Sequence, residues 1–112
     1  MESTRQQKIA RLIQKDLGEI FQMQARSLFM GAMITVTKIN ITKDMSLARV
    51  YVSIFGVKDK EELLDIIRRH TRDIRREMGN REKNQLRIIP DLQFFIDDSL
   101  DYIENIDHLL NK

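Results

Sequence analysis

The chain contains no cysteine, a single proline and only four scattered glycines. The absence of cysteine excludes a disulfide framework and any zinc or iron–sulfur site built on thiolates. The scattered glycines exclude a glycine-rich phosphate-binding loop. No apolar run approaches the ~18 residues that a membrane-spanning helix needs, and the polar start MESTRQQKIA lacks the apolar core of a signal peptide. These absences predict a cytoplasmic protein that has no membrane partner.

Positive charge is concentrated in one stretch, although the 112 residues carry a formal net charge of only +2. Residues 68–87, RRHTRDIRREMGNREKNQLR, hold eight basic and three acidic side chains, and seven of the basic ones are arginine. Residues 88–112 hold one basic and six acidic side chains, so a basic middle is followed by an acidic end. Because the planar guanidinium suits bidentate contact with phosphate, the basic stretch favours a nucleic-acid-binding surface.

The spacing of apolar residues predicts an α+β fold in a single domain, residues 1–112. Residues 9–21 repeat at three- and four-residue spacing, which indicates an amphipathic helix. A second, long helix is expected over residues 59–79, with the glycine and asparagine at 79–80 as its stop signal. A short final helix is expected to begin at residue 98 or 99.

Three strands are expected between these helices. Two segments are rich in β-branched side chains: residues 34–42, ITVTKINIT, and residues 47–55, LARVYVSIF. Because turn-forming residues lie between them, they predict an antiparallel hairpin. In the first strand the apolar positions shift parity, so we expect either a bulge near Thr37–Lys38 or burial on both faces. Residues 91–97, DLQFFID, alternate in polarity after the proline and predict the third strand.

The predicted core draws on all of these elements. Tyr51 and Phe55 are candidates for stacking on bases, but core packing is favoured for both. Aromatic residues make up only 6% of the chain, so reading of a base sequence is expected to be modest. We expect the core to include Ile9, Ile13, Leu17, Val36, Val50, Val52, Ile67, Ile74, Leu92 and Phe94.

Two groups of basic residues are candidates for contact with phosphates. The first lies in the basic stretch and comprises Arg68, Arg69, Arg72, Arg75, Arg76, Arg81, Lys83 and Arg87. The second is a stripe along the first helix, formed by Lys8, Arg11 and Lys15. An ordinary solvated face is the alternative interpretation of each group. Within the first group, Arg72, Arg75 and Arg76 avoid the apolar stripe of their helix and are expected to be exposed.

No arrangement of residues predicts catalysis. His70 falls on the apolar stripe of its helix, where a packed side chain is the favoured interpretation. The carboxylates between Asp91 and Asp107 could hold magnesium or calcium, but several of them lie at a helix start, where the helix dipole alone favours acid. We therefore expect no enzyme activity, metal, cofactor or small-molecule substrate. A metal-dependent nuclease built on these carboxylates is kept as an alternative.

The expected α-β-β-α-β order is the topology of a type II KH-like domain, a three-stranded sheet with its helices packed on one face. Three segments carry a more specific resemblance: KIARLIQKDLGEIFQ, ITVTKINITKDMSLARVYVSIFG and LRIIPDLQFFIDDSLD. Their order and distances resemble the opening helix, the hairpin ending in A-x-V-Y-V-S and the last strand of the bacterial ribosome-binding factor A family. The resemblance covers nearly all of the chain.

The resemblance implies a function that composition alone does not. Members of the family bind the free small (30S) ribosomal subunit during its assembly. They assist maturation and 5′-end processing of 16S rRNA, matter most in the cold, leave before translation and are not enzymes. The implied partner is the small subunit with its 16S rRNA, bound by a monomer that recognises the shape of the folded RNA. A permanent ribosomal protein and a basic protein-interaction module are the alternatives.

The chain departs from ordinary KH domains where two helices meet. Those domains grip RNA with a G-x-x-G loop, which this chain and the family both lack. The family usually has an A-x-G interruption at the corresponding place, and here it aligns with His70, Thr71 and Arg72. Because arginine replaces the glycine, a kink at this point must be enforced by packing.

Overall fold

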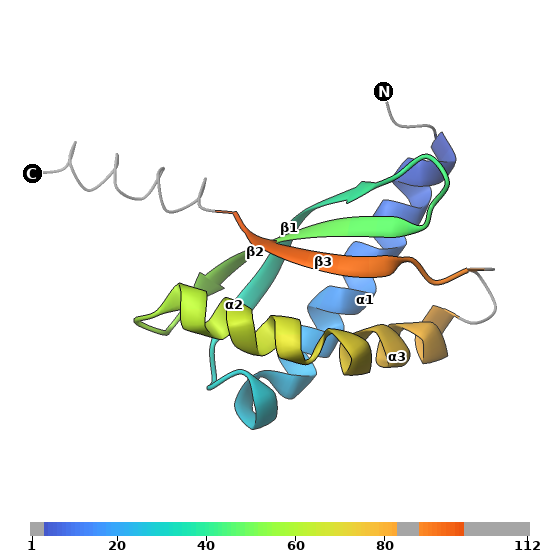
Figure 1. Ribbon diagram of the computed structural model, residues 1–112. Coiled ribbons are helices and arrows are strands. Elements are labelled where there is room, and N and C mark those ends of the chain that lie inside the picture. The colour runs from blue at the N-terminus through green and yellow to red at the C-terminus, as the bar shows by residue number, and fades with distance from the viewer. Residues whose placement is uncertain (1–3, 83–87, 98–112) are drawn as a thin grey trace, which may run out of the picture.

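Six elements follow one another in the computed structural model, which describes residues 4–82 and 88–97. They are α1 (Thr4–Leu28), β1 (Met33–Ile41), β2 (Leu47–Phe55), α2 (Lys60–Arg69), α3 (Thr71–Glu82) and β3 (Asp91–Ile96). The α+β class and the α-β-β-α-β order are confirmed (Figure 1). The expected final helix lies outside the described residues. Within the two described ranges, no helix is long and apolar enough to cross a membrane.

β2 is the central strand of a mixed sheet in the order β1-β2-β3. β1 and β2 form the expected antiparallel hairpin. β3 lies parallel to β2, with Asp91 beside Leu47 and Ile96 beside Val52. A parallel neighbour requires a crossover connection, and the chain makes this crossover through α2 and α3. The two helices therefore run over the sheet on their way from β2 to β3.

A β-bulge in β1 accounts for the parity shift of its apolar residues. The register with β2 moves between Val36 and Lys38. Val36 and Ile39 are both buried, whereas Lys38 is exposed. In a regular strand Lys38 would share the face of Val36, because side chains alternate with a period of two residues. The bulge is thus confirmed, and it keeps the lysine ammonium out of the core.

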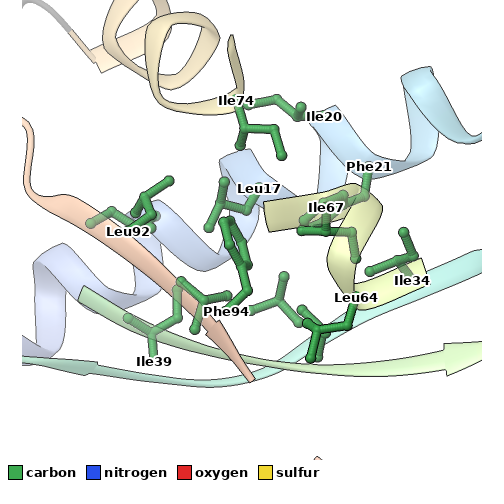
Figure 2. Packing of buried hydrophobic residues seen from close by; sticks show 14 of the residues in the cluster. Leu17, Ile20, Phe21, Ile34, Ile39, Leu64, Ile67, Ile74, Leu92 and Phe94 are labelled. Atoms are coloured by element: carbon green, nitrogen blue, oxygen red, sulfur yellow. The ribbon is translucent and has the colours of Figure 1, made fainter. Parts of the chain in front are cut away.

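The helices and the buried side chains of the strands lie on the same side of the sheet (Figure 2). Phe94 is 1% exposed, and its ring meets the ring of Phe21 edge to face with centroids 5.9 Å apart. Of the predicted core residues, only Ile9 is half-buried, at the margin of the cluster, and the others are buried. Burying each of the larger side chains contributes about 1.5–3 kcal/mol, so this one face supplies the main stabilisation of the fold.

The long second helix of the sequence prediction is in fact two helices that meet at His70. The backbone of His70 leaves helical values at φ −98° and ψ 9°, and its N–H donates to the carbonyls of Ile66 and Ile67. The ring Nδ1 lies 2.9 Å from the Ile66 oxygen, and the ring packs edge to face on Phe29 at 6.1 Å. A negative φ is open to any residue, so the break needs no glycine.

The predicted stop at Gly79 and Asn80 is wrong, because α3 continues to Glu82. A Cβ on Gly79 would lie 3.6 Å from Cγ1 of Ile89, an ordinary contact, so the glycine sits against the segment that leads to β3. Glu82 is buried, and Arg81 bonds to α1. These tertiary contacts hold the last turn of α3 in place, although Gly79 and Asn80 favour the end of a helix.

Two glutamines of α1 cap the outer edge of β1. Nε2 of Gln14 donates to the carbonyl of Val36 at 2.9 Å, and Nε2 of Gln6 donates to the carbonyl of Ile41 at 2.8 Å. An uncapped edge strand offers unpaired backbone groups to other chains, so this cover opposes edge-to-edge association. The glutamines also fix the position of α1 along the strand.

We expect Phe94→Ala to lower the free energy of unfolding by about 3–5 kcal/mol, the usual cost of removing a buried phenylalanine. Urea denaturation followed by circular dichroism measures this change. Gln93→Ala, at the exposed neighbouring position, is the control and should stay within about 0.5 kcal/mol of the unsubstituted protein. A loss for Phe94→Ala no greater than that of the control would contradict its central place in the core.

Candidate nucleic-acid interface

Two arginines of the basic stretch bind the outer edge of β3. Arg68 donates from Nε and Nη2 to the carbonyl of Phe94, at 3.2 and 2.8 Å. Arg75 donates from Nε to the carbonyl of Pro90 at 3.1 Å and from Nη2 to that of Ile89 at 2.7 Å. Seven residues separate the two arginines, which is about two helical turns, so both project from one side of the α2–α3 pair. They cap β3 as the glutamines cap β1.

The expectation that Arg75 is exposed is therefore wrong. Its side chain is half-buried, with 42% of its surface exposed, and Nε also lies 3.5 Å from Oδ1 of Asp91. A guanidinium engaged by two carbonyls and a carboxylate has little remaining capacity for a phosphate. The backbone carbonyls that hold it belong to a segment distant in sequence, and the helical pattern alone could not reveal them.

Arg81 joins α3 to α1. Its Nη1 lies 2.6 Å from Oε2 of Glu19, Nε lies 3.6 Å from Oε1 of Glu77, and Nη2 donates to Sδ of Met23 at 3.1 Å. Only 23% of the arginine side chain is exposed. Three of the predicted phosphate-binding arginines thus hold elements of the fold together.

The other three described arginines of the group form an exposed line, which we call the arginine stripe: Arg69, Arg72 and Arg76. None of them makes a hydrogen bond or ion pair with a described residue. Their spacing of three and four residues places them on one side of the helices, opposite the buried Ile67 and Ile74. They are free to meet phosphates.

A hollow of about 420 Å³ opens beside this stripe. It is lined by Arg72, Arg75, Arg76, Gly79 and Ile89. The absence of a side chain at Gly79 leaves room between the helix and the segment before β3. Two unpaired guanidinium groups at the rim of a hollow are suited to a phosphate group, because each can donate two parallel hydrogen bonds.

The stripe predicted on the first helix is present on α1. Lys8, Arg11 and Lys15 are all exposed. At about 100° per residue, they lie on the side of α1 opposite the buried Ile13 and Leu17. Since the helices cover one face of the sheet, this stripe and the arginine stripe both face away from the sheet. The structure thus brings the two predicted groups onto one helical layer, which the sequence could not establish.

An acidic seam separates the two stripes where α1 and α3 meet. It consists of Asp16, Glu19 and Glu77 around Arg81. Asp16 is buried, and its Oδ2 has no hydrogen-bond partner among the described residues. Burial raises the pKa of the Asp16 carboxyl above its ordinary value, and the positive charge of Arg81 offsets part of this shift. Because two glutamates, Glu19 and Glu77, pair with the one guanidinium of Arg81, the seam carries excess negative charge between two basic surfaces.

The remaining candidates from the sequence are two basic residues, the acidic cluster and His70, and the described residues form no site around them. Lys83 and Arg87 lie outside the described residues, as do all but Asp91 and Asp97 of the acidic cluster. In the part of the chain that the structure describes, no group of three or more histidine and acidic side chains is placed to hold a metal ion. His70 is half-buried at the helix break, as its position on the apolar stripe suggested.

The expected core packing of Tyr51 and Phe55 is wrong. Both are half-buried and lie outside the core cluster, on the sheet face away from the helices. The Tyr51 ring stacks on Phe95 with centroids 5.4 Å apart, and the ammonium of Lys60 lies 5.7 Å from the Phe55 ring centre. The strict alternation of β2 around Val50 and Val52 was the signal that could have placed them there.

Comparison with known proteins identifies the family. A family model described as ribosome-binding factor A matches residues 5–110. The chain belongs to this family. Ribosome-binding factor A of Cytophaga hutchinsonii is 42% identical over 112 residues, which span 100% of this chain and 84% of the relative.

Solved structures of ribosome-binding factor A share the fold. The crystal structure of the Thermus thermophilus protein matches with a TM-score of 0.68 at 23% identity, over 81% of this chain and 94% of that one. Coordinates of the Thermus thermophilus factor, a homology model fitted into a cryo-electron microscopy map of a 30S complex, match with a TM-score of 0.61 at 25% identity. This second match covers 78% of this chain and 89% of the other.

The two roles of the arginines predict different effects on stability. Arg75→Ala should lower the free energy of unfolding by about 1–3 kcal/mol, because it leaves the carbonyls of Ile89 and Pro90 without their charged donor. Arg72→Ala, one turn away and exposed, is the matched control and should change it by less than about 0.5 kcal/mol. Urea denaturation of both variants measures the difference. Equal stability of the two would contradict the structural role of Arg75.

The buried carboxyl of Asp16 predicts a dependence of stability on pH. Because its folded-state pKa is raised, its contribution to stability is full below the ordinary value of 3.8 and is lost as the pH rises through the folded-state value. Asp16→Asn removes this titration. The unfolding free energy of the variant, relative to the unsubstituted protein, should therefore increase from about pH 3 to about pH 7. Circular dichroism checks that the Asp16→Asn variant keeps the fold.

Proposed function

We propose that this protein is an assembly factor that binds the free small ribosomal subunit and assists the late maturation and 5′-end processing of its 16S rRNA, with greatest importance in the cold. Membership of the ribosome-binding factor A family supports the proposal, as does the relative fitted into the map of a 30S complex. Residues 1–112 would act as a single KH-like RNA-binding domain, as a monomer in the cytoplasm. The action is binding, without a catalytic residue, cofactor or small-molecule substrate.

The arginine stripe is the observation that carries this proposal. Three exposed guanidinium groups with no partner among the described residues lie in one line, beside a hollow that has room for a phosphate. Neutralisation of RNA phosphates releases condensed counterions, and this release supplies much of the affinity of such surfaces. The stripe on α1 extends the charged area, so the helical layer would lie against the ribosomal RNA.

Recognition on this layer would depend on the shape of the RNA. The helical layer offers guanidinium and ammonium groups but few aromatic rings on which bases could stack. Phosphate contacts position a protein on a nucleic acid and carry little information about sequence. The acidic seam, through the partly exposed Glu19 and Glu77, would repel an RNA backbone that crosses between the stripes. Folded rRNA would then be preferred when its phosphates can reach both the arginine stripe and the stripe on α1 without crossing the seam.

The experiment measures binding to purified small subunits by cosedimentation at several salt concentrations. Substitution of Arg69, Arg72 and Arg76 together by glutamine should weaken binding. It should also make the slope of log affinity against log salt shallower by about 2–3 units, at ~0.7–0.9 per phosphate contact. The protein should sediment with free small subunits and be absent from translating ribosomes, where a permanent ribosomal protein would be found.

The matched control removes the same charge elsewhere. Arg26, Lys43 and Lys58 are exposed and lie outside both stripes. Their joint substitution by glutamine should leave the salt slope unchanged within error. Circular dichroism checks that each triple variant is folded. A folded stripe variant with the affinity and slope of the unsubstituted protein would show that the arginine stripe is only a solvated face.

A further inference from the structure

The sheet face turned away from the helices carries a row of side chains that crosses all three strands. Lys38 on β1 is the register partner of Tyr51 on β2, and Tyr51 is the register partner of Phe95 on β3. Arg68 of α2 continues the row beyond β3. The result is a cation–aromatic–aromatic–cation arrangement, which we call the cross-sheet row. Among the described residues, no helix covers it.

The contacts within the row are unequal at its two ends. The rings of Tyr51 and Phe95 stack at 5.4 Å with an angle of 28° between their planes. The guanidinium carbon of Arg68 lies 6.0 Å from the Phe95 ring centre, and two hydrogen bonds to the Phe94 carbonyl fix it there. Nζ of Lys38 lies 5.9 Å from the Tyr51 ring centre and makes no hydrogen bond or ion pair with a described residue. Among the described residues, the cation that lies over the outer face of Tyr51 is thus the flexible, exposed ammonium of Lys38.

The bulge in β1 is what places Lys38 in this row. If β1 paired regularly with β2 here, Lys38 would share the core-facing side of Val36, and Thr37 would be the neighbour of Tyr51. Bulges commonly re-aim a side chain next to a functional site. The irregularity that protects the core thus also brings a cation beside the ring of Tyr51.

A second row lies two residues away from the first on each strand. It consists of Asn40, Arg49 and Gln93, which are register partners across β1, β2 and β3. Arg49 and Gln93 are exposed, and none of the three makes a hydrogen bond with a described side chain. The two amides can both donate and accept, which matches the mixed edges of unpaired bases. Neither row contains a carboxylate, although that of Asp97 accepts a hydrogen bond at 2.5 Å from the hydroxyl of Thr37 beside the first row.

We propose that this open sheet face is a second RNA contact, at which an unpaired base of single-stranded rRNA stacks on the outer face of Tyr51. The base replaces the ammonium of Lys38, which then meets the adjoining phosphate, and the Asn40–Arg49–Gln93 row meets the next nucleotide. An acidic protein would pair with the cations but would leave the ring face and the amides unused, so the chemistry favours nucleic acid. This inference rests on the proposed function, since it deepens the contact with ribosomal RNA.

The test uses the full chain and a short fluorescently labelled oligouridylate, with a matched probe that lacks its bases but keeps its phosphates. Tyr51→Leu removes the ring, whereas Tyr51→Phe keeps it and is the control. Fluorescence anisotropy should show that Tyr51→Leu weakens binding to oligouridylate by about fivefold or more, the effect of losing one stacked base. The salt slope should be unchanged, because no phosphate contact is removed. The control should bind as the unsubstituted protein does, and the baseless probe should not distinguish the variants.

A second measurement does not depend on the folding of a variant. In the unsubstituted protein, the ring protons of Tyr51 should shift in nuclear magnetic resonance spectra when oligouridylate is added, and should not shift with the baseless probe. Equal binding of oligouridylate by a folded Tyr51→Leu variant, or an unmoved Tyr51 ring, would overturn the proposal. Ile103 is an apolar residue of the acidic end, residues 88–112. A Tyr51 ring that responds to Ile103→Ser but not to RNA would also overturn the proposal, because it would assign this face to that end of the chain.

The outcome is separable from that of the proposed function. The arginine stripe is tested through the salt slope with intact subunits, and the sheet face through the dependence on bases with a short RNA. An unchanged salt slope in the Arg69, Arg72 and Arg76 variant would count against the helical layer alone. If Tyr51→Leu bound oligouridylate as tightly as the unsubstituted protein does, this result would count against the sheet face alone.

Discussion

A three-stranded sheet has two faces and two edges, and in this protein the helices cover one face and cap both edges. Burial of that face beneath α1, α2 and α3 provides the main stabilisation. Gln6 and Gln14 hold α1 against β1, and Arg68 and Arg75 hold α2 and α3 against β3. The remaining face of the sheet is left without a described cover, and its side chains can serve another purpose.

The need to fix the helices against the sheet edges and against one another separates the arginines of the basic stretch into two groups. A guanidinium on the side of α2 or α3 that adjoins β3 or α1 finds a carbonyl or a carboxylate, as Arg68, Arg75 and Arg81 do. A guanidinium on the outward side is exposed and has no partner among the described residues, as with Arg69 and Arg72. Arginine serves both purposes because its fork matches backbone carbonyls as well as phosphate oxygens. A single run of basic residues therefore both assembles the domain and supplies its surface charge.

The opposite surfaces differ in chemistry. The helical layer offers charge without rings, which suits the backbone of folded RNA. The sheet face offers a ring pair flanked by cations and amides, which suits unpaired bases. A protein with both could hold a structured and a single-stranded part of one RNA at the same time, as an immature ribosomal subunit would present them. The two surfaces respond to different variables: the salt concentration for the first and the presence of unpaired bases for the second.

Periodicity in the sequence determined the first helix, the strands, the hairpin and nearly all of the core, because these depend on local alternation of apolar side chains. It also located the irregularity in β1, and the structure decided between a bulge and burial on both faces. Periodicity failed where distant segments meet. The helix break at His70 and the continuation past Gly79 depend on contacts with Phe29 and Ile89 that no local pattern encodes. Composition likewise revealed the excess of arginine in one stretch. Only the tertiary structure decided which guanidinium groups are engaged, because that depends on the backbone carbonyls of β3 that reach α2 and α3 through folding.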